Sequence, residues 1–278
     1  MCYRSRHAPS RSVCQFLLSI VAALFTLTST NAQRVVDRNS NSWFTYLGDH
    51  RIKEHWSVHT EAHLRRAEVG ASAQQLLLRP AVNFHMTNDV MFTFGYSYYR
   101  NERYGAFPIQ VANWENHLYQ QVQLKARYGR LALQHRFRME ERFIALLRTE
   151  PGMDPGHTFT GYAYQSRFRY RVAVTVPLNG KGAIEPGTWF LSAYDELFLN
   201  FGASDKLDHM QQNRISVLVG HQFWSQGNVQ LGYLLQTIQR PAAAAGADLL
   251  EMNDTVHLML TYDLDLRPKA KKAPVTTP

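Results

Sequence analysis

Cysteine is nearly absent from the chain: among its 278 residues only Cys2 and Cys14 are cysteines, and both lie near the N-terminus. The rest of the chain therefore has neither disulfides nor thiolate metal ligands to stabilise its fold. A large chain that folds without such links needs another source of stability. A closed β-sheet, in which every strand edge is paired, is one such source.

Long apolar runs are scarce as well. The mean hydropathy is −0.33, which excludes a bundle of membrane-spanning helices, because each such helix needs about 20 consecutive apolar residues. It does not exclude a membrane β-barrel, whose strands alternate apolar and polar residues and so average out. With 45% hydrophobic and 12% aromatic residues, the chain is too apolar to be disordered. Soluble all-β, mixed α/β and outer-membrane barrel folds remain.

The first 32 residues have the pattern of a secretory signal peptide. Three arginines precede a mostly apolar stretch from Val13 to Thr28, and Thr30-Asn31-Ala32 resembles a small-residue cleavage site. The apolar stretch is short for a spanning helix, and no charged stop-transfer run follows it. We therefore expect residues 1–32 to be a signal peptide cleaved near Ala32, and the rest of the chain to be exported.

Acidic residues are fewer than basic ones, 22 against 30, which gives a formal net charge of +8. The predicted leader holds three of the arginines, so the exported part carries +5. Part of that excess lies in residues 267–278, a basic C-terminal tail with three lysines. Because an exported chain rarely meets nucleic acid, we expect no nucleic-acid partner.

Strand-like alternation recurs along residues 33–266, which we expect to form one domain. From Val90 to Tyr98, for example, every second residue is valine, phenylalanine or tyrosine. The stretch from Glu140 to Arg148 has helical propensity, but the alternation that begins at Leu131 favours a strand there. The eleven candidate strands are Trp43–Leu47, Trp56–Leu64, Leu76–Met86, Val90–Tyr98, Leu118–Tyr128, Leu131–Phe143, Phe168–Val176, Trp189–Phe201, Ile215–Phe223, Val229–Leu235 and Val256–Leu264.

Such a sheet can face either way. In a soluble sandwich the apolar face points to a core, whereas in an outer-membrane barrel it meets lipid and the polar face lines the lumen. Segments of about ten residues favour the barrel, since soluble strands average about five or six. Bacterial barrels usually have an even number of strands. Without the short Trp43 segment the count is ten strands, and both ends of the barrel lie on the periplasmic side. A count of twelve would require one further strand, so we expect about 10–12 strands.

Two further features favour the barrel. Short connections, as at Gln226-Gly227-Asn228, alternate with long ones, as at Arg100 to Asn113, although the connection from Leu178 to Gly187 fits less well. Short turns on one rim and long loops on the other are typical of outer-membrane barrels. Aromatic residues also gather near the ends of the segments, as in the girdles at membrane interfaces. These aromatics are Trp43, Trp114, Tyr128, Trp189, Phe223 and Trp224.

The order of several local patterns resembles DUF2490, a bacterial family of uncharacterised outer-membrane barrels. The matching pieces are Glu115–Gln121, Arg136–Phe143, Arg167–Arg171, Ala193–Phe201, Asn213–Ile215 and Gly232–Leu234. The resemblance spans roughly Trp43 to Leu266 and implies an outer-membrane barrel. It carries no known catalytic residues. The chain departs from the usual barrel ending, because Arg267 to Pro278 continues past the last candidate strand.

The polar faces of the strands carry an unusual number of arginines. One hypothesis is a basic track that lowers the barrier for small anionic solutes. The alternative is an internal ion-pair network that fills a narrow barrel, and we favour it because buried arginines need partners. The predicted lumen arginines are Arg127, Arg136, Arg138, Arg167, Arg169, Arg171 and Arg214, and their predicted acidic partners are Glu61, Glu115, Glu140 and Glu196.

The sequence predicts neither a metal site nor catalysis. His59, Glu61 and His63 alternate along one strand, but residues four apart in a strand lie about 13 Å from each other. One strand therefore offers at most two ligands, and a polar lumen wall is the better interpretation. No strand shows serine and histidine two apart together with a separate asparagine in a recognisable pattern, and no glycine-rich phosphate loop occurs. We expect no cofactor and no enzyme activity.

The sequence therefore predicts an all-β protein, a single antiparallel up-and-down barrel in the outer membrane of a Gram-negative bacterium. Its expected partners are outer-membrane lipid, the outer-membrane assembly machinery and small anionic solutes. The expected role is a small pore or a structural barrel with a basic lumen. Two alternatives remain open: a membrane-embedded lipid-modifying enzyme and a soluble exported β-sandwich that binds a partner.

Overall fold

The computed structural model describes residues 35–149, 157–180, 182–201, 210–240 and 249–268. The predicted signal peptide over residues 1–32 and nearly all of the predicted tail therefore lie outside the described residues. The described chain is all-β, and its only helical element is one 3-10 turn, Glu68–Gly70. No helix within these ranges is both long and apolar enough to cross a membrane.

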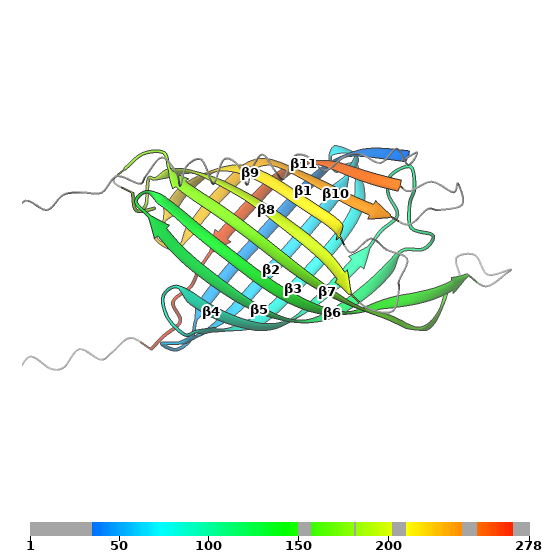
Figure 1. The fold of residues 1–278 in the computed structure, drawn as a ribbon, viewed down its shortest axis with the longest axis horizontal. Coiled ribbons are helices and arrows are strands. Elements are labelled where there is room, and N and C mark those ends of the chain that lie inside the picture. The colour runs from blue at the N-terminus through cyan, green and yellow to red at the C-terminus, as the bar shows by residue number, and fades with distance from the viewer. Residues whose placement is uncertain (1–34, 150–156, 181, 202–209, 241–248, 269–278) are drawn as a thin grey trace, which may run out of the picture. The chain divides into compact units, whose positions relative to one another are not determined.

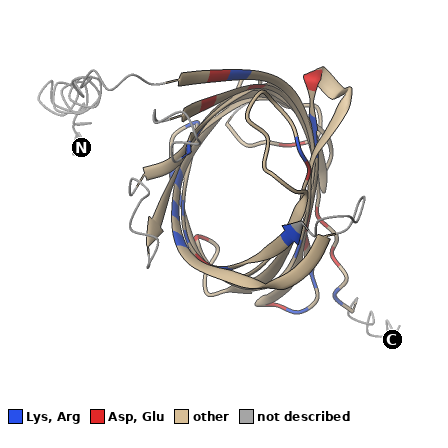
Figure 2. Cartoon of the chain, turned by 90° about the vertical axis from the view of Figure 1, so that its right-hand side faces the viewer, with Lys and Arg blue, Asp and Glu red and all other residues tan. Residues whose placement is uncertain are grey.

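Eleven strands form one closed barrel, in which each strand pairs antiparallel with the next one along the chain (Figure 1). Viewed along its axis, the sheet forms a ring (Figure 2). The prediction of an up-and-down barrel with about 10–12 strands is confirmed. The strands are β1 (Val35–Arg51), β2 (Trp56–Ala67), β3 (Ser72–His85), β4 (Val90–Asn101), β5 (Asn113–Tyr128), β6 (Leu131–Thr149), β7 (His157–Pro177), β8 (Trp189–Phe201), β9 (Met210–Trp224), β10 (Gly227–Arg240) and β11 (Leu249–Tyr262).

The barrel closes between β1 and β11, and this pairing is parallel, from Val35↔Leu249 to Leu47↔Thr261. With an odd number of alternating strands, the first and the last necessarily run in the same direction. The weak Trp43 segment is in fact the middle of a 17-residue strand. The ten-strand alternative, with both ends of the barrel at one rim, is wrong: β1 begins at the rim opposite to the one where β11 ends.

The connections divide the barrel into a short-turn rim and a long-loop rim. Between β5 and β6, and between β9 and β10, the short-turn rim has connections of two residues. At the long-loop rim residues 102–112 connect β4 to β5, and β6, β8 and β10 also end there, each with seven or eight residues before the next strand begins. Two connections depart from this division: residues 178–188 form a long connection on the short-turn rim, and residues 68–71 a short one on the long-loop rim.

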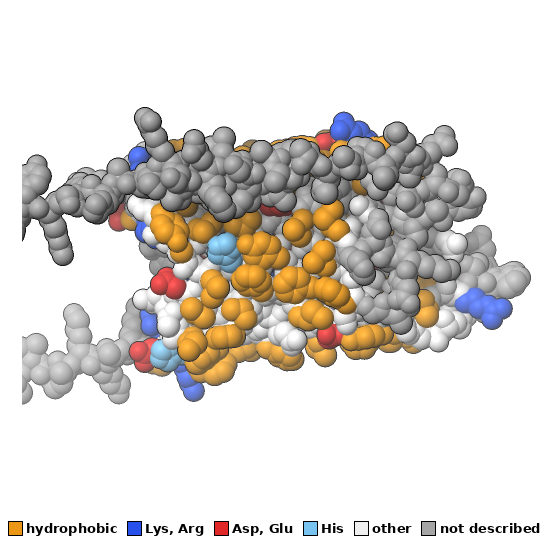
Figure 3. Space-filling model, in the orientation of Figure 1, with side chains coloured by type: hydrophobic (Ala, Val, Ile, Leu, Met, Phe, Trp, Pro, Cys, Tyr) orange, Lys and Arg blue, Asp and Glu red, His pale blue; other side chains and the backbone are white. Residues whose placement is uncertain are grey.

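The sheet is apolar outside and polar inside. Phe94, on β4, is 62% exposed, and Leu231, on β10, is 54% exposed. Figure 3 shows apolar side chains over much of the visible outer surface. Ser57 and Glu140, by contrast, point inward and are completely buried. A soluble sandwich, which needs two sheets packed through their apolar faces, is therefore excluded as the fold.

Aromatic side chains lie near both rims on the outer surface. Trp56 packs on Phe84 near the short-turn rim, with ring centroids 5.0 Å apart, and Trp114 stacks on Phe159 near the long-loop rim at 5.6 Å. Among the aromatics predicted for the girdles, Tyr128, Trp189, Phe223 and Trp224 are at least half exposed. The prediction that Trp43 belongs to a girdle is wrong. Trp43 is 2% exposed and points into the barrel, because the full strand places it on the inner face.

The parallel seam can be tested with cysteines, because the chain has none after residue 14. Phe44 and Leu258 are direct partners across the seam, and both point outward. In a chain that lacks residues 1–32, we expect Phe44→Cys with Leu258→Cys to form an intramolecular disulfide on oxidation. The measurement is the mobility of the denatured, non-reduced protein on a gel.

The control pair is Phe44→Cys with Leu260→Cys, which is displaced by two residues, about 7 Å along the strand. That displacement puts the two Cα atoms beyond the range of a disulfide, about 7 Å, so this pair should not cross-link. Equal cross-linking of both pairs would contradict the register of the seam.

Candidate functional site in the barrel interior

Arginines face each other across the hairpin of β6 and β7. Arg136 lies directly opposite Arg171, and Arg138 lies opposite Arg169. Directly opposed like charges destabilise a sheet unless something compensates them. Carboxylates supply part of that compensation: Glu140 on β6 lies opposite Arg167, and Glu196 on β8 lies opposite Arg171.

Glu140 is the first of two acidic centres in this region, and it is completely buried. One of its oxygens accepts hydrogen bonds from Arg167 at 2.6 and 2.8 Å, and the other accepts one from Arg169 at 2.6 Å. Arg138 adds a longer ion pair at 3.7 Å. One carboxylate thus pairs with three guanidinium groups.

Glu196 is the second centre. Its Oε1 accepts hydrogen bonds from Arg136 at 2.5 Å and from Arg169 at 2.7 and 3.0 Å. Arg171 and Arg214 are its direct neighbours on β7 and β9, yet neither forms an ion pair among the described residues. We call the eight residues of these two centres the arginine cluster: Arg136, Arg138, Arg167, Arg169, Arg171, Arg214, Glu140 and Glu196.

The predicted residues outside the cluster have separate partners. Glu61 on β2 pairs with Arg79, and Glu115 on β5 pairs with Arg142 at 2.7 Å. Arg127 lies near the short-turn rim, where its Nη1 donates to the carbonyl oxygen of Gly182 at 2.9 Å. Six of the seven predicted arginines and two of the four predicted glutamates therefore come together in the cluster.

Sequence analysis missed Arg65, Arg79 and Arg142, which are all at most 7% exposed. Arg65 and Arg79 have inward positions on β2 and β3, and continuing the alternation past Leu64 would have found Arg65. Continuing the alternation past Arg138 would likewise have found Arg142, which shares the inner face of β6 with Arg138 and Glu140. All three arginines belong to the inner wall.

Aromatic rings pack against the inward arginines. The guanidinium of Arg65 lies 3.9 Å from the ring centroid of Trp43, and that of Arg138 lies 4.4 Å from Tyr119. Gly95 faces Tyr119 from β4, and a Cβ there would come within 2.6 Å of the ring. Stacking of this kind stabilises a guanidinium without neutralising its charge.

The packed side chains form a layer across the interior, with a cavity on each side. On the short-turn side lies a cavity of about 840 Å³, which we call the short-turn chamber. On the long-loop side lies a cavity of about 290 Å³, which we call the long-loop pocket. Arg65, Tyr99, Arg169 and Arg214 line both cavities and so belong to the layer between them.

The lining of the short-turn chamber is strongly basic. It includes nine lysine and arginine side chains but only four aspartates and glutamates. His59, Glu61 and His63 contribute to its wall, and both histidines contact Glu61, at 3.3 and 2.6 Å. Within the described residues no group of three histidines, cysteines or carboxylates is arranged to hold a metal ion.

Residues 102–112 fold over the long-loop pocket. Tyr104 donates a hydrogen bond to Glu251 on β11, and the backbone N–H of Glu102 donates to the carbonyl oxygen of Gln74 at 2.9 Å. Burial, and then the nearby charge of Glu251, raise the pKa of Tyr104 to about 12. Because its hydroxyl stays protonated, Tyr104 fastens this connection to the opposite wall.

A serine, a histidine and an aspartate meet near the short-turn rim. The hydroxyl of Ser57 lies 2.8 Å from Nε2 of His85 and donates to Asp49. In a catalytic triad the carboxylate orients the histidine through its other ring nitrogen. Here Asp49 contacts the same nitrogen, Nε2, at 3.4 Å, and Ser57 is completely buried. The arrangement links β1, β2 and β3 rather than activating a nucleophile.

Comparison with known families gives one match. Residues 40–246 match the family described as "Protein of unknown function (DUF2490)". Neither the curated proteins nor the solved structures contain a match to the chain.

The ion pairs of Glu196 can be tested by removing its charge. Glu196→Gln leaves Arg136 and Arg169 without this carboxylate, and breaking a buried ion pair costs about 3–5 kcal/mol. We expect a loss of that size in the free energy of unfolding, measured by urea titration of the detergent-folded protein. Glu102→Gln is the control, since its partner Arg100 is 61% exposed and such surface pairs contribute about 0–1 kcal/mol. Equal losses in both variants would contradict the network.

Proposed function

We propose that this chain, which belongs to the DUF2490 family, is an outer-membrane β-barrel with a passive role. Its narrow basic lumen is interrupted by the layer of arginines and aromatic rings. In this proposal the first 32 residues direct export and are removed, and the assembly machinery inserts the barrel from the periplasm of a Gram-negative bacterium. Outer-membrane lipid is then the partner of the outer surface.

The observation that carries the proposal is the inverted polarity of the sheet. Apolar side chains such as Phe94 and Leu231 are exposed on the outer face of the barrel, while many charged side chains are buried inside it. Water would make so large an apolar surface aggregate, whereas lipid solvates it. Closure of the sheet also gives every strand a hydrogen-bonded neighbour on both sides, a condition for any β-structure within a bilayer.

The spacing of the aromatic residues supports the same proposal. On β5, Trp114 and Tyr128 lie 14 positions apart, near opposite rims. At about 3.3 Å per residue and a tilt of about 45°, this separation corresponds to about 33 Å along the barrel axis. The apolar core of a bilayer is about 30 Å thick, so the two aromatic groups match its interfaces.

The proposed orientation places the long loops outside the cell. β1 then begins at the outer rim, because it runs parallel to β11. Cleavage after Ala32 would leave only Gln33 and Arg34 before β1. Insertion would therefore carry only a short polar segment across the membrane.

The interior supports a passive role. A barrel of this size lies between the filled eight-stranded type and the open porins of 16 to 18 strands, and the layer between the two cavities narrows it further. Small anions are the solutes that the basic wall favours. The geometry around Ser57 does not support a lipid-modifying activity, because Asp49 does not orient His85 as a triad requires.

The first experiment is fractionation of the producing cells, followed by gel electrophoresis of boiled and unboiled samples. We expect the protein in the outer-membrane fraction, with a band that shifts on boiling because a closed barrel resists detergent until heated. In planar bilayers the protein should show a low conductance with anion preference. A periplasmic protein without a heat-dependent shift would overturn the proposal.

A charge on the outer surface tests for lipid contact. Phe94 lies near the middle of β4, and Phe94→Arg should cost about 2–4 kcal/mol of folding free energy in a lipid bilayer. Val36→Arg is the control, because Val36 is exposed near the long-loop rim, where the same change costs about 0–1 kcal/mol. Refolding into vesicles in urea measures both. A surface that faces water would tolerate both substitutions within about 0.5 kcal/mol.

A further inference from the structure

The arginine cluster has more positive charge than its own carboxylates neutralise. Six arginines surround two glutamates, and both glutamates already pair with several guanidinium groups. A buried charge without a partner is costly. Some other source of negative charge should therefore stabilise the cluster.

Arg171 is a cluster member that forms no ion pair among the described residues. Within the described ranges its one hydrogen bond, from Nη2, goes to the side-chain oxygen of Gln134 at 3.0 Å, although a guanidinium has five N–H donors. Its guanidinium also lies 5.4 Å from the ring centroid of Tyr194. Arg171 thus presents an unpaired charge to the short-turn chamber, whose wall it forms.

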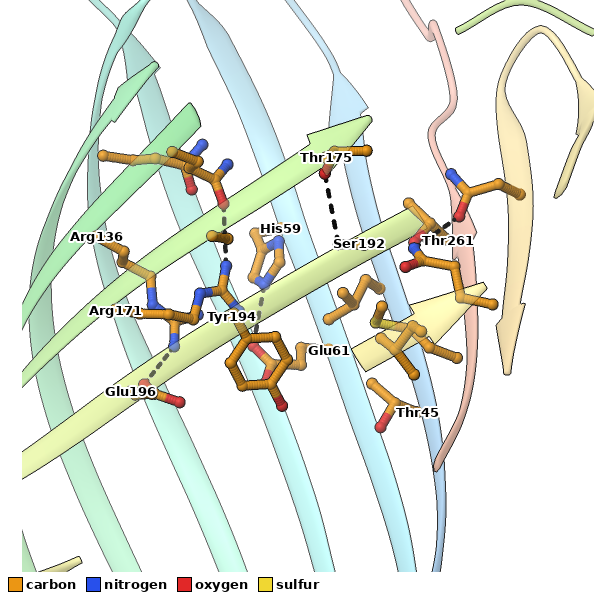
Figure 4. Close-up of a pocket in the computed structure, with 18 of the residues that line it drawn as sticks. Thr45, His59, Glu61, Arg136, Arg171, Thr175, Ser192, Tyr194, Glu196 and Thr261 are labelled. Atoms are coloured by element: carbon orange, nitrogen blue, oxygen red, sulfur yellow. Dashed lines mark hydrogen bonds and ion pairs between the residues drawn. The ribbon is translucent and has the colours of Figure 1, made fainter. Parts of the chain in front are cut away.

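Arg136 stands beside Arg171 on the neighbouring strand and faces the same chamber (Figure 4). It donates only from Nη2, to Glu196, and its Nε is buried without a partner. Direct partners on neighbouring strands have Cβ atoms about 5 Å apart. Two arginines whose Cβ atoms are this close can direct their guanidinium groups at the oxygens of one multiply charged anion.

The approach to this pair is also favourable for an anion. Lys125 and Arg127 line the same chamber nearer the short-turn rim. Hydroxyl groups of Thr175, Ser192 and Thr261 supply neutral donors on the chamber wall (Figure 4). Cations along a concave wall concentrate anions and steer them inward.

We propose that the short-turn chamber is a binding site for a polyvalent oxyanion, held mainly by Arg171 and Arg136. Guanidinium groups bind phosphate and carboxylate oxygens in pairs and are suited to this class of ligand. A monovalent ion such as chloride would leave most of the excess charge uncompensated. The inference rests on the proposed function only for the compartment that supplies the anion, which would be the periplasm.

The test is isothermal titration calorimetry of the detergent-folded full-length exported chain, residues 33–278, with inorganic pyrophosphate as the probe and chloride at matched ionic strength as the reference. We expect one pyrophosphate per barrel and no saturable binding of chloride. Arg171→Gln should weaken pyrophosphate binding about tenfold or more, as expected for the loss of a charge-assisted contact. Arg171→Lys keeps the positive charge but lacks the paired N–H donors of a guanidinium. Its affinity for pyrophosphate should lie between those of the unaltered protein and Arg171→Gln.

Arg142→Gln is the matched control, because it removes a buried arginine that lines the long-loop pocket and not the chamber. Its binding of pyrophosphate should equal that of the unaltered protein. Without ligand, Arg171→Gln should unfold at the same temperature as the unaltered protein or a higher one, since an unpaired buried charge is gone. The heat-dependent gel shift verifies that each variant is folded.

Absence of pyrophosphate binding, or equal weakening by Arg171→Gln and Arg142→Gln, would overturn the inference. These outcomes are distinct from a failure of the proposed function. A protein found outside the outer membrane that still binds pyrophosphate through Arg171 would refute the location and support the site. An outer-membrane barrel that binds no pyrophosphate would support the location and refute the site.

Discussion

The hydrogen bonds between β1 and β11 close the sheet, and the other features of the structure depend on that closure. Because the strand number is odd, the closing pair must be parallel. This in turn places the beginning of β1 at the long-loop rim and the end of β11 at the short-turn rim. Closure also turns one face of every strand toward a shared interior. Since most of the inward residues are polar, closing the sheet creates a confined space in which many charges must find partners.

The charged interior is a consequence of the small circumference. In a wide barrel the arginines would extend into water, whereas here Arg138 is 2% exposed and Glu140 is completely buried. Burial requires compensation, and the chain provides it by ion pairs with Glu140 and Glu196 and by aromatic rings such as those of Trp43 and Tyr119. The same contacts divide the interior into two cavities. Rings stabilise guanidinium groups but add no negative charge, which is why the short-turn chamber keeps a basic wall.

Interpretation of the sequence succeeded where local alternation was regular. The segment from Leu131 proved to be a strand despite its helical propensity, because the period of two continues through it. The interpretation of Trp43 was wrong. Because Trp43 is close to the end of its candidate segment, it was placed at a membrane interface, but the residue points inward. The segment was thought short because Asp37 to Ser42 is polar on both faces. Its pairing with β11, not its own pattern, makes this stretch a strand.

The sequence by itself determined which residues share a face, since successive side chains of a strand point to opposite sides. It therefore determined that the arginines and the glutamates belong to the polar face. Only the tertiary structure decided which of them meet, because partners across strands depend on the register between segments as far apart in the chain as β1 and β11. Glu196 lies opposite both Arg171 and Arg214 but pairs with Arg136 and Arg169 instead. The partners of Glu196 depend on how side chains from several strands pack in the closed interior. The sequence of one strand carries no information about that packing.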